Sequence, residues 1–297
     1  MITLLKTERG TEMSISKAEI IGIVRKHMDE CNLNNFAVIG KPDELMWQDV
    51  IIGFGRGDDA YFDFLKEDIG EFHWSPEEAF KLGKKDADVA SKDILVVSLG
   101  FQKAQKVKEL NAEETKEPTL RWVAARGEWE TLVASISEKI VSDIESAGLK
   151  AVAIEHISEF KRKRSEKYGI ASNWSHRHVA FMCGLGTFGH CDGLITPKGK
   201  AMRFTTILIE TDLEADIRSY EKYNEWCKRA NGDGCGVCIE RCPVNALTAD
   251  GHDKEKCEKF VQHVRDKALS EGVLTSNTST ACGLCQCGTP CQDGIPI

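Results

Sequence analysis

Residues 235–243 read CGVCIERCP, and this short stretch decides how the rest of the chain is interpreted. Its spacing matches the last three cysteines of the bacterial ferredoxin motif C-x2-C-x2-C-x3-C-P. Gly232 stands where the motif has its first cysteine, and Cys227 is the nearest cysteine that replaces it. The stretch therefore predicts thiolate ligands of an iron–sulfur cluster.

The cysteines around this stretch are numerous enough for two clusters. The chain has 12 cysteines, and nine of them lie from Cys227 onward. Two [4Fe–4S] clusters take four thiolates each, and in two-cluster ferredoxins the cysteine before the proline ligates the other cluster. We expect a first cysteine set of Cys227, Cys235, Cys238 and Cys291, and a second cysteine set of Cys242, Cys257, Cys282 and Cys285. Cys287 competes with Cys291 for the last place.

Zinc is the alternative interpretation, because repeated C-x2-C pairs are also typical of zinc sites. A zinc site has no need of C-x3-C-P, however, and nine clustered cysteines exceed what one zinc ion requires. The pattern favours iron–sulfur clusters.

Composition and charge restrict the class of protein. The chain has 297 residues, of which 41% are hydrophobic and 29% charged, as in ordinary globular proteins. The net charge is −8, with no overall basic character of the kind typical of nucleic-acid binders. No stretch is apolar enough to cross a bilayer, and residues 1–10 lack a signal-peptide core or a twin-arginine pair. We expect a cytoplasmic protein, where clustered cysteines indicate metal ligands rather than disulfides.

The sequence before the cysteines alternates helical and extended patterns. Helices are expected over 14–30, with Ser14 or Ser16 as the cap, from the capping box at Ser75, and over about 120–147. Buried strands are expected over 35–40, 93–100, 151–155 and 203–210. The predicted fold class is an α/β domain over 1–215, with its sheet covered by helices, followed by a bacterial-ferredoxin-like double [4Fe–4S] module over 216–297. The basic run 161–164 is expected to be a solvated helix face.

Residues 184–189 read GLGTFG and match the dinucleotide motif G-x-G-x-x-G. That motif needs a strand before it and a helix after it, whereas here 175–182 is predicted helical and 190–196 extended. The sequence therefore disfavours dinucleotide binding. Glycines at this density let the backbone approach a bulky ligand closely, and a tight turn without a ligand is the alternative.

The stretch from His178 to Asp212, followed by the cysteines, resembles the epoxyqueuosine reductase and reductive dehalogenase superfamily. The matching elements are the 184–189 loop, the Leu-Ile-Thr-Pro segment 194–197, Arg203 and the cysteines from Cys235 onward. The segment 53–59 and the region of Trp47 resemble a short branch of the same superfamily.

This resemblance implies a corrinoid-binding α/β domain and two [4Fe–4S] clusters that feed electrons to the corrinoid cobalt, which reduces a small molecule. It implies corrinoid contacts from Gly184, Gly186, Gly189, His190, Thr196 and Arg203. Epoxyqueuosine reductase has an aspartate as proton donor upstream of the glycine loop, but 168–173 contains no carboxylate. Tyr168, His176 and His178 are the candidates for proton delivery, since histidine titrates near neutrality. A purely structural role is the alternative for each.

Two further functions stay open at this stage. The protein could be an electron carrier that reduces a partner protein, for example a corrinoid protein, without a substrate of its own, or a zinc-containing regulatory protein. An external donor of ferredoxin or flavodoxin type is expected for either redox function. We do not expect tRNA as a substrate, because the tRNA-acting enzyme extends past its clusters with a helical region and this chain ends six residues after Cys291. We also expect no membrane partner.

Overall fold

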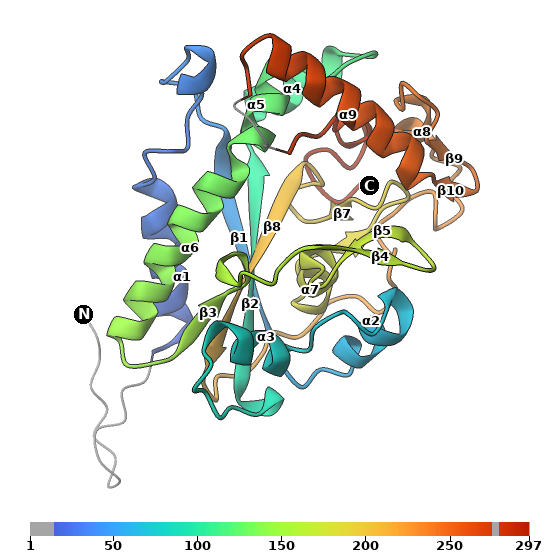
Figure 1. Cartoon of the computed structure of the whole chain (residues 1–297). Coiled ribbons are helices and arrows are strands. Elements are labelled where there is room, and N and C mark those ends of the chain that lie inside the picture. The colour runs from blue at the N-terminus through green and yellow to red at the C-terminus, as the bar shows by residue number, and fades with distance from the viewer. Residues whose placement is uncertain (1–14, 275–278, 297) are drawn as a thin grey trace, which may run out of the picture.

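A four-stranded sheet forms the centre of the computed structural model, which describes residues 15–274 and 279–296. The strand order is β1-β2-β8-β3, and all three pairings are antiparallel. The strands span Trp47–Arg56 (β1), Ile94–Lys103 (β2), Ala151–Ala153 (β3) and Met202–Glu210 (β8). Helices cover both faces of the sheet, as Figure 1 shows. The mixed α/β character predicted from the sequence is confirmed.

The central strand β2 explains why the sheet is covered twice. All its residues are buried, and successive side chains point to opposite faces. Leu95, Val97 and Leu99 belong to one hydrophobic cluster with residues of α1 (Lys17–Asp29), α5 (Leu120–Gly127) and α6 (Trp129–Ser146). Ile94 and Val96 belong to a second cluster with residues of α2 (Tyr61–Ile69), α3 (Pro76–Gly83) and α7 (His176–Met182). A strand that is apolar on both faces has to lie between two layers of helices.

The helices begin where capping residues stand. Ser75 accepts a hydrogen bond from the Glu78 N–H at the start of α3, so the predicted capping box forms. Ser16, one of the two predicted caps, does the same for Glu19 at the start of α1 and also forms a capping box. Ser14 lies outside the described residues. The helices before the cysteines span Lys17–Asp29 (α1), Tyr61–Ile69 (α2), Pro76–Gly83 (α3), Gln105–Glu113 (α4), Leu120–Gly127 (α5), Trp129–Ser146 (α6) and His176–Met182 (α7).

Three predicted elements differ in the structure. The expected strand over 35–40 is a 3-10 turn, Ala37–Ile39, because the Asn35 side chain accepts the Ala37 N–H and closes a turn locally. The expected helix over 120–147 is divided into α5 and α6 after Gly127, a residue that weakens helices. The basic run 161–164 is mostly strand rather than helix. It belongs to the hairpin of β4 (Arg162–Ser165) and β5 (Gly169–Ser172).

The cysteine-rich segment has little regular structure and packs against the sheet domain. Its elements span Val237–Glu240 (α8), Leu247–Thr248 (β9), Gly251–His252 (β10), Lys254–Ser270 (α9) and Leu284–Gln286 (η4). Val264, Ala268 and Cys287 share a buried cluster with α5 and α6. The division at 215/216 remains a prediction.

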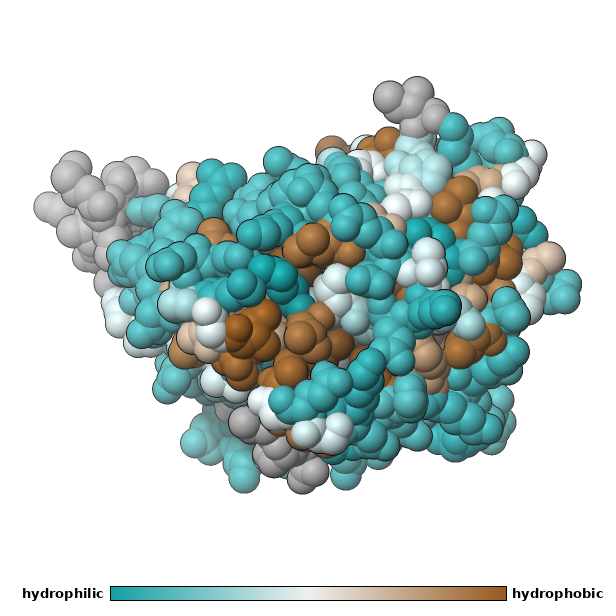
Figure 2. Space-filling model, turned by 90° about the horizontal axis from the view of Figure 1, so that it is seen from above, coloured by the Kyte–Doolittle hydropathy of each residue, from teal (hydrophilic) through white to brown (hydrophobic). Residues whose placement is uncertain are grey.

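The surface seen from above is mostly hydrophilic, and hydrophobic side chains gather in patches between the polar ones (Figure 2). No helix in the described parts of the chain is long and apolar enough to cross a membrane.

Candidate functional site

A cavity of about 1070 Å³, here called the large cavity, lies where the β4–β5 hairpin, α7, β8 and α9 meet. Tyr168, His176, His178 and Arg203 line it, so four of the residues predicted from the sequence are brought together. Cys257, a member of the second cysteine set, lines the same cavity. The volume lies at the upper end of the range for cofactor pockets, so the cavity fits a large cofactor.

Ion pairs hold the walls of the large cavity together. Arg162 and Arg164 of the hairpin pair with Glu258 and Glu255 of α9 at 2.8 and 2.7 Å. Deeper in the wall, Asp192 pairs with His252 at 2.8 Å. The basic run is mostly exposed to solvent, as expected, and two of its arginines pair with the cysteine-rich segment.

His176 contacts a carboxylate that the sequence did not single out. Its Nε2 lies 3.3 Å from Oε1 of Glu155, and its Nδ1 lies 3.0 Å from the Thr206 hydroxyl. Burial raises the pKa of Glu155 to about 7, whereas burial and nearby Arg203 lower the pKa of His176 to about 3. At neutral pH His176 is therefore neutral, and Glu155 is divided between its protonated and ionised forms.

His178 and Tyr168 are held by hydrogen bonds at the same cavity. The Nδ1 of His178 lies 2.6 Å from the Ser175 hydroxyl, and burial lowers the pKa of His178 to about 3. The Tyr168 hydroxyl donates to Asp68 at 2.7 Å, and burial raises its pKa. The expectation that these histidines titrate near neutrality is therefore wrong, because both are desolvated.

The glycine loop follows helix α7, as expected, and its glycines serve contacts within the chain. A Cβ on Gly186 would lie 2.1 Å from the Ile195 carbonyl oxygen, and Gly189 donates its N–H to Gly193. Gly184 has a φ of +80°, a conformation that favours glycine. The loop pairs β6 (Thr187–Phe188) with β7 (Leu194–Ile195). None of the three predicted glycines lines the large cavity, and their cofactor role stays a prediction.

The two remaining predicted residues also make internal contacts. The Thr196 hydroxyl donates to the Gly199 carbonyl at 2.7 Å and closes a turn. The Nε2 of His190 lies 2.6 Å from the Thr248 carbonyl oxygen, on the side of the cysteines.

The first cysteine set lines one small cavity, whose other walls include His190 and Lys200. All four of its members are there: Cys227, Cys235, Cys238 and Cys291. In the second cysteine set, Cys282 lies within electrostatic range of Cys242 and Cys257. Within 15–274 and 279–296, no three His, Cys, Asp or Glu side chains converge on a single metal ion.

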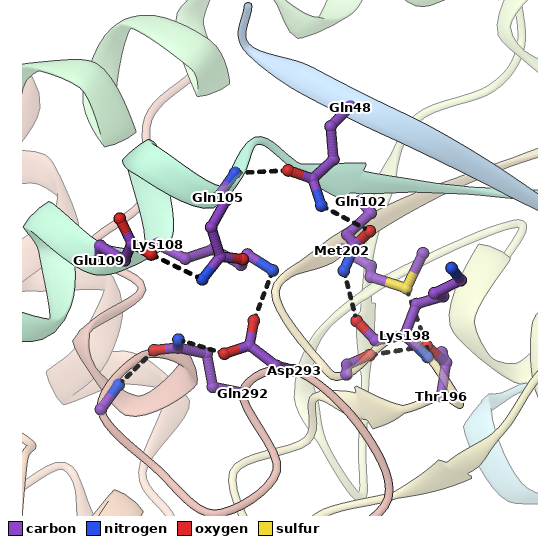
Figure 3. Close-up of polar contacts among 12 residues, drawn as sticks. Gln48, Gln102, Gln105, Lys108, Glu109, Thr196, Lys198, Met202, Gln292 and Asp293 are labelled. Atoms are coloured by element: carbon purple, nitrogen blue, oxygen red, sulfur yellow. Dashed lines mark hydrogen bonds and ion pairs between the residues drawn. The ribbon is translucent and has the colours of Figure 1, made fainter.

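The sequence did not decide whether Cys287 or Cys291 is the last ligand of the first cysteine set. Cys287 is fully buried in the main hydrophobic cluster. Cys291 lies at the small cavity, and its carbonyl accepts the Lys200 N–H at 3.0 Å. Figure 3 shows how the following residues are fixed, with Asp293 bound by Lys108 of α4 at 2.5 Å. This placement favours Cys291.

Two residues near the cysteines were missed by the sequence analysis. Cys191 lies next to Cys238 and Cys285, and the Nζ of buried Lys200 lies 3.6 Å from the Cys191 Sγ. Burial opposes the charge of Lys200, but the surrounding thiols raise its pKa. The chain has more cysteines than the eight that two clusters need, and this surplus was the only hint in the sequence that Cys191 could also lie near the clusters. The donor set of soft thiols and a buried cation fits an anionic iron–sulfur cluster.

Comparisons with known proteins bear on this arrangement. No family model matches the chain. Epoxyqueuosine reductase of Staphylococcus aureus (strain NCTC 8325 / PS 47) is 24% identical over 262 residues, which are 82% of this chain and 61% of that enzyme. The resemblance predicted from the sequence is confirmed. The chain spans about three fifths of the length of this relative.

Three solved structures share the fold of this chain. An epoxyqueuosine reductase bound to an epoxyqueuosine-modified tRNA stem loop matches with a TM-score of 0.52 and 14% identity, over 95% of this chain and 66% of that chain. A catabolic reductive dehalogenase matches with a TM-score of 0.53 and 15% identity, over 99% of this chain and 34% of that chain. A third structure, described as suggesting a mechanism for B12-dependent dehalogenation, has a TM-score of 0.50 and 15% identity, over 95% of this chain and 33% of that chain. At these identities the likeness concerns the fold.

Proposed function

We propose that this protein is an iron–sulfur reductase that binds two [4Fe–4S] clusters and a corrinoid, and that reduces a small molecule. The observation that carries the proposal is the lining of the large cavity. Cys257 of the second cysteine set and the side chains of His176, His178 and Arg203 face the same space. A cluster held by Cys257 would therefore border the place where a substrate or cofactor binds.

Each group has its place in this proposal. The two cysteine sets would hold the clusters, which supply single electrons. The walls of the large cavity would hold the corrinoid, whose cobalt supplies two-electron reduction when it is bound. Arg203 is half-buried, its Nε has no hydrogen-bond partner in the described residues, and its guanidinium would orient an anionic group in the cavity.

Proton supply is the task of the chain's own residues. Glu155 is the group that exchanges a proton near neutral pH, because burial raises its pKa to about 7. His176 is neutral and lines the cavity, and its Nε2 lies 3.3 Å from Oε1 of Glu155, so the two residues would together supply a proton at this wall. Glu155 thus takes the role that the sequence analysis sought among Tyr168, His176 and His178 alone.

The proposed partners follow from the chemistry. The clusters need an external electron donor of ferredoxin or flavodoxin type. One of the similar solved structures, an epoxyqueuosine reductase, contains a tRNA stem loop, but the net charge of −8 favours a small molecule here.

The deciding experiment is an anaerobic titration of the iron-loaded protein with cob(II)alamin, followed by visible absorption. We expect a saturable spectral shift that persists through gel filtration. An unchanged spectrum, with both clusters intact, would contradict corrinoid binding and favour an electron carrier that serves a partner protein. Loss of iron in favour of zinc would contradict both redox functions.

A further inference from the structure

Lys200 is a buried lysine without a carboxylate partner. It follows the turn that Thr196 closes, and 3% of its surface is exposed. Among the described residues, Lys200 forms no ion pair with a carboxylate, and its Nζ donates to the Cys191 Sγ at 3.6 Å. Lys108 is equally buried but pairs with Asp293. Because a buried ammonium needs a compensating negative charge, Lys200 points to an anion that the carboxylates do not supply.

The groups that surround Lys200 are thiols from both cysteine sets. Besides Cys191, those within electrostatic range are Cys238 and Cys291 of the first set and Cys285 of the second. Cys191 itself lies next to Cys238 and Cys285. Lys200 therefore stands where the two sets approach each other, and its own N–H fixes the Cys291 carbonyl.

We propose that Lys200 is the positioning residue that compensates the charge of both clusters and raises their reduction potentials. This inference rests on the proposed clusters and goes beyond them, since it assigns a residue that sets how readily they accept electrons. One-electron reduction adds one negative charge to a cluster. A fixed cation in a site of low dielectric constant stabilises this reduced form more than the oxidised form.

The test compares anaerobically reconstituted wild-type protein with three variants. Lys200→Met removes the charge, and Lys200→Arg keeps it. Lys198→Met is the matched control, because Lys198 lies two residues away, is 52% exposed in its side chain and faces Asp49. Iron content is measured first, and the midpoint potentials are then determined by redox titration followed by electron paramagnetic resonance.

We expect Lys200→Met to retain its iron and to lower the equilibrium constant for cluster reduction at least about tenfold, which corresponds to ~59 mV for one electron. Lys200→Arg and Lys198→Met should stay close to wild type. Equal potentials in Lys200→Met and wild type would overturn the proposal, and so would an equal fall in Lys200→Arg.

The control measurements keep this proposal separate from the proposed function. If wild-type protein takes up no iron, the clusters themselves are wrong. If only Lys200→Met fails to assemble its clusters, Lys200→Gln replaces it in the comparison with Lys200→Arg. The proposal then requires the midpoint potentials of Lys200→Gln to be lower than those of Lys200→Arg. Failure of every Lys200 variant to hold iron would assign Lys200 to cluster assembly and contradict the role in setting potentials.

Discussion

At the scale of single residues, Glu155 has the most specific consequence. Its folded-state pKa is about 7 and its ordinary value is near 4.5, so the folded chain keeps a proton that the unfolded chain releases. The free energy of unfolding therefore falls as pH rises from about 4.5 through 7. The total loss is of order 3 kcal/mol at 1.36 kcal/mol for each pKa unit.

Glu155→Gln should remove this loss, because an amide does not titrate. We expect the stability of the variant relative to wild type to increase by about 3 kcal/mol between pH 4.5 and pH 8, measured by urea unfolding at each pH. The matched control is Glu138→Gln, at an exposed position of α6. A difference that is the same at both pH values would mean that Glu155 is ionised in the folded protein.

Cysteines of two kinds give the second prediction at this scale. Cys238 belongs to the first cysteine set at the small cavity, whereas Cys183 is buried among apolar residues of α7 and the sheet. Cys238→Ser should lose the iron of one cluster and destabilise the C-terminal segment, because metal binding and folding are coupled. Cys183→Ser should keep the iron content of wild type. Equal loss of iron in both variants would show that the assignment of the first set is wrong.

At the scale of elements, the sequence was informative where a local rule decides the structure. The capping boxes at Ser16 and Ser75 and the apolar run of β2 were predictable, because each depends on neighbouring residues. The segment 35–40 was not, because apolar runs of this length do not distinguish a strand from a turn when no partner strand is known. What decides the turn is the hydrogen bond from the Ala37 N–H to the Asn35 side chain, which the sequence analysis did not consider.

The turn 196–199 gives a prediction of its own. Gly199 has a φ of +87°, and a Cβ there would lie 1.9 Å from the Gln292 carbonyl oxygen. Gly199→Ala should therefore strain the turn and displace the segment after Cys291. We expect a loss of about 2–4 kcal/mol in unfolding free energy, together with weaker cluster retention.

The matched control for this variant is Gly22→Ala. Gly22 lies exposed in α1, and a Cβ there would meet nothing within 4 Å. That variant should stabilise the protein by roughly 0.5–1 kcal/mol, because alanine favours helices more than glycine does. A Gly199→Ala protein as stable as wild type would mean that the C-terminal segment is not held against this turn.

At the scale of the whole molecule, the sequence predicts cluster ligands but says little about the residues that surround them. Spacing predicts ligands among the cysteines from Cys227 onward, since ligand counting needs no three-dimensional information. It could not place Glu155 beside His176, nor Cys191 and Lys200 among the cysteines, because these contacts join segments far apart in the chain. The contacts that set charge and protonation are therefore those that only the folded chain reveals.

The same long-range contacts decide whether 1–215 and 216–297 unfold separately. Trp122 of α5 packs so closely on Gly283 that a Cβ there would lie 1.9 Å from its ring. The Arg241 guanidinium donates to the carbonyls of Asn111 and Glu114, at the end of α4. Helices α4 and α5 of the sheet domain thus contact the cysteine-rich segment, so loss of the clusters should lower the stability of both parts.

Thermal unfolding before and after removal of iron by a chelator tests this coupling. Because the clusters bind the folded segment and not the unfolded chain, we expect chelation to lower the melting temperature. We also expect tryptophan fluorescence and cluster absorbance to change in a single transition in the loaded protein, since buried Trp47, Trp122 and Trp129 report on the sheet domain. If chelation abolished the cluster absorbance but left the tryptophan transition at its original temperature, the two parts would be independent folding units. The boundary at 215/216 would then be a true domain boundary, and the interface around Trp122 would contribute little to stability.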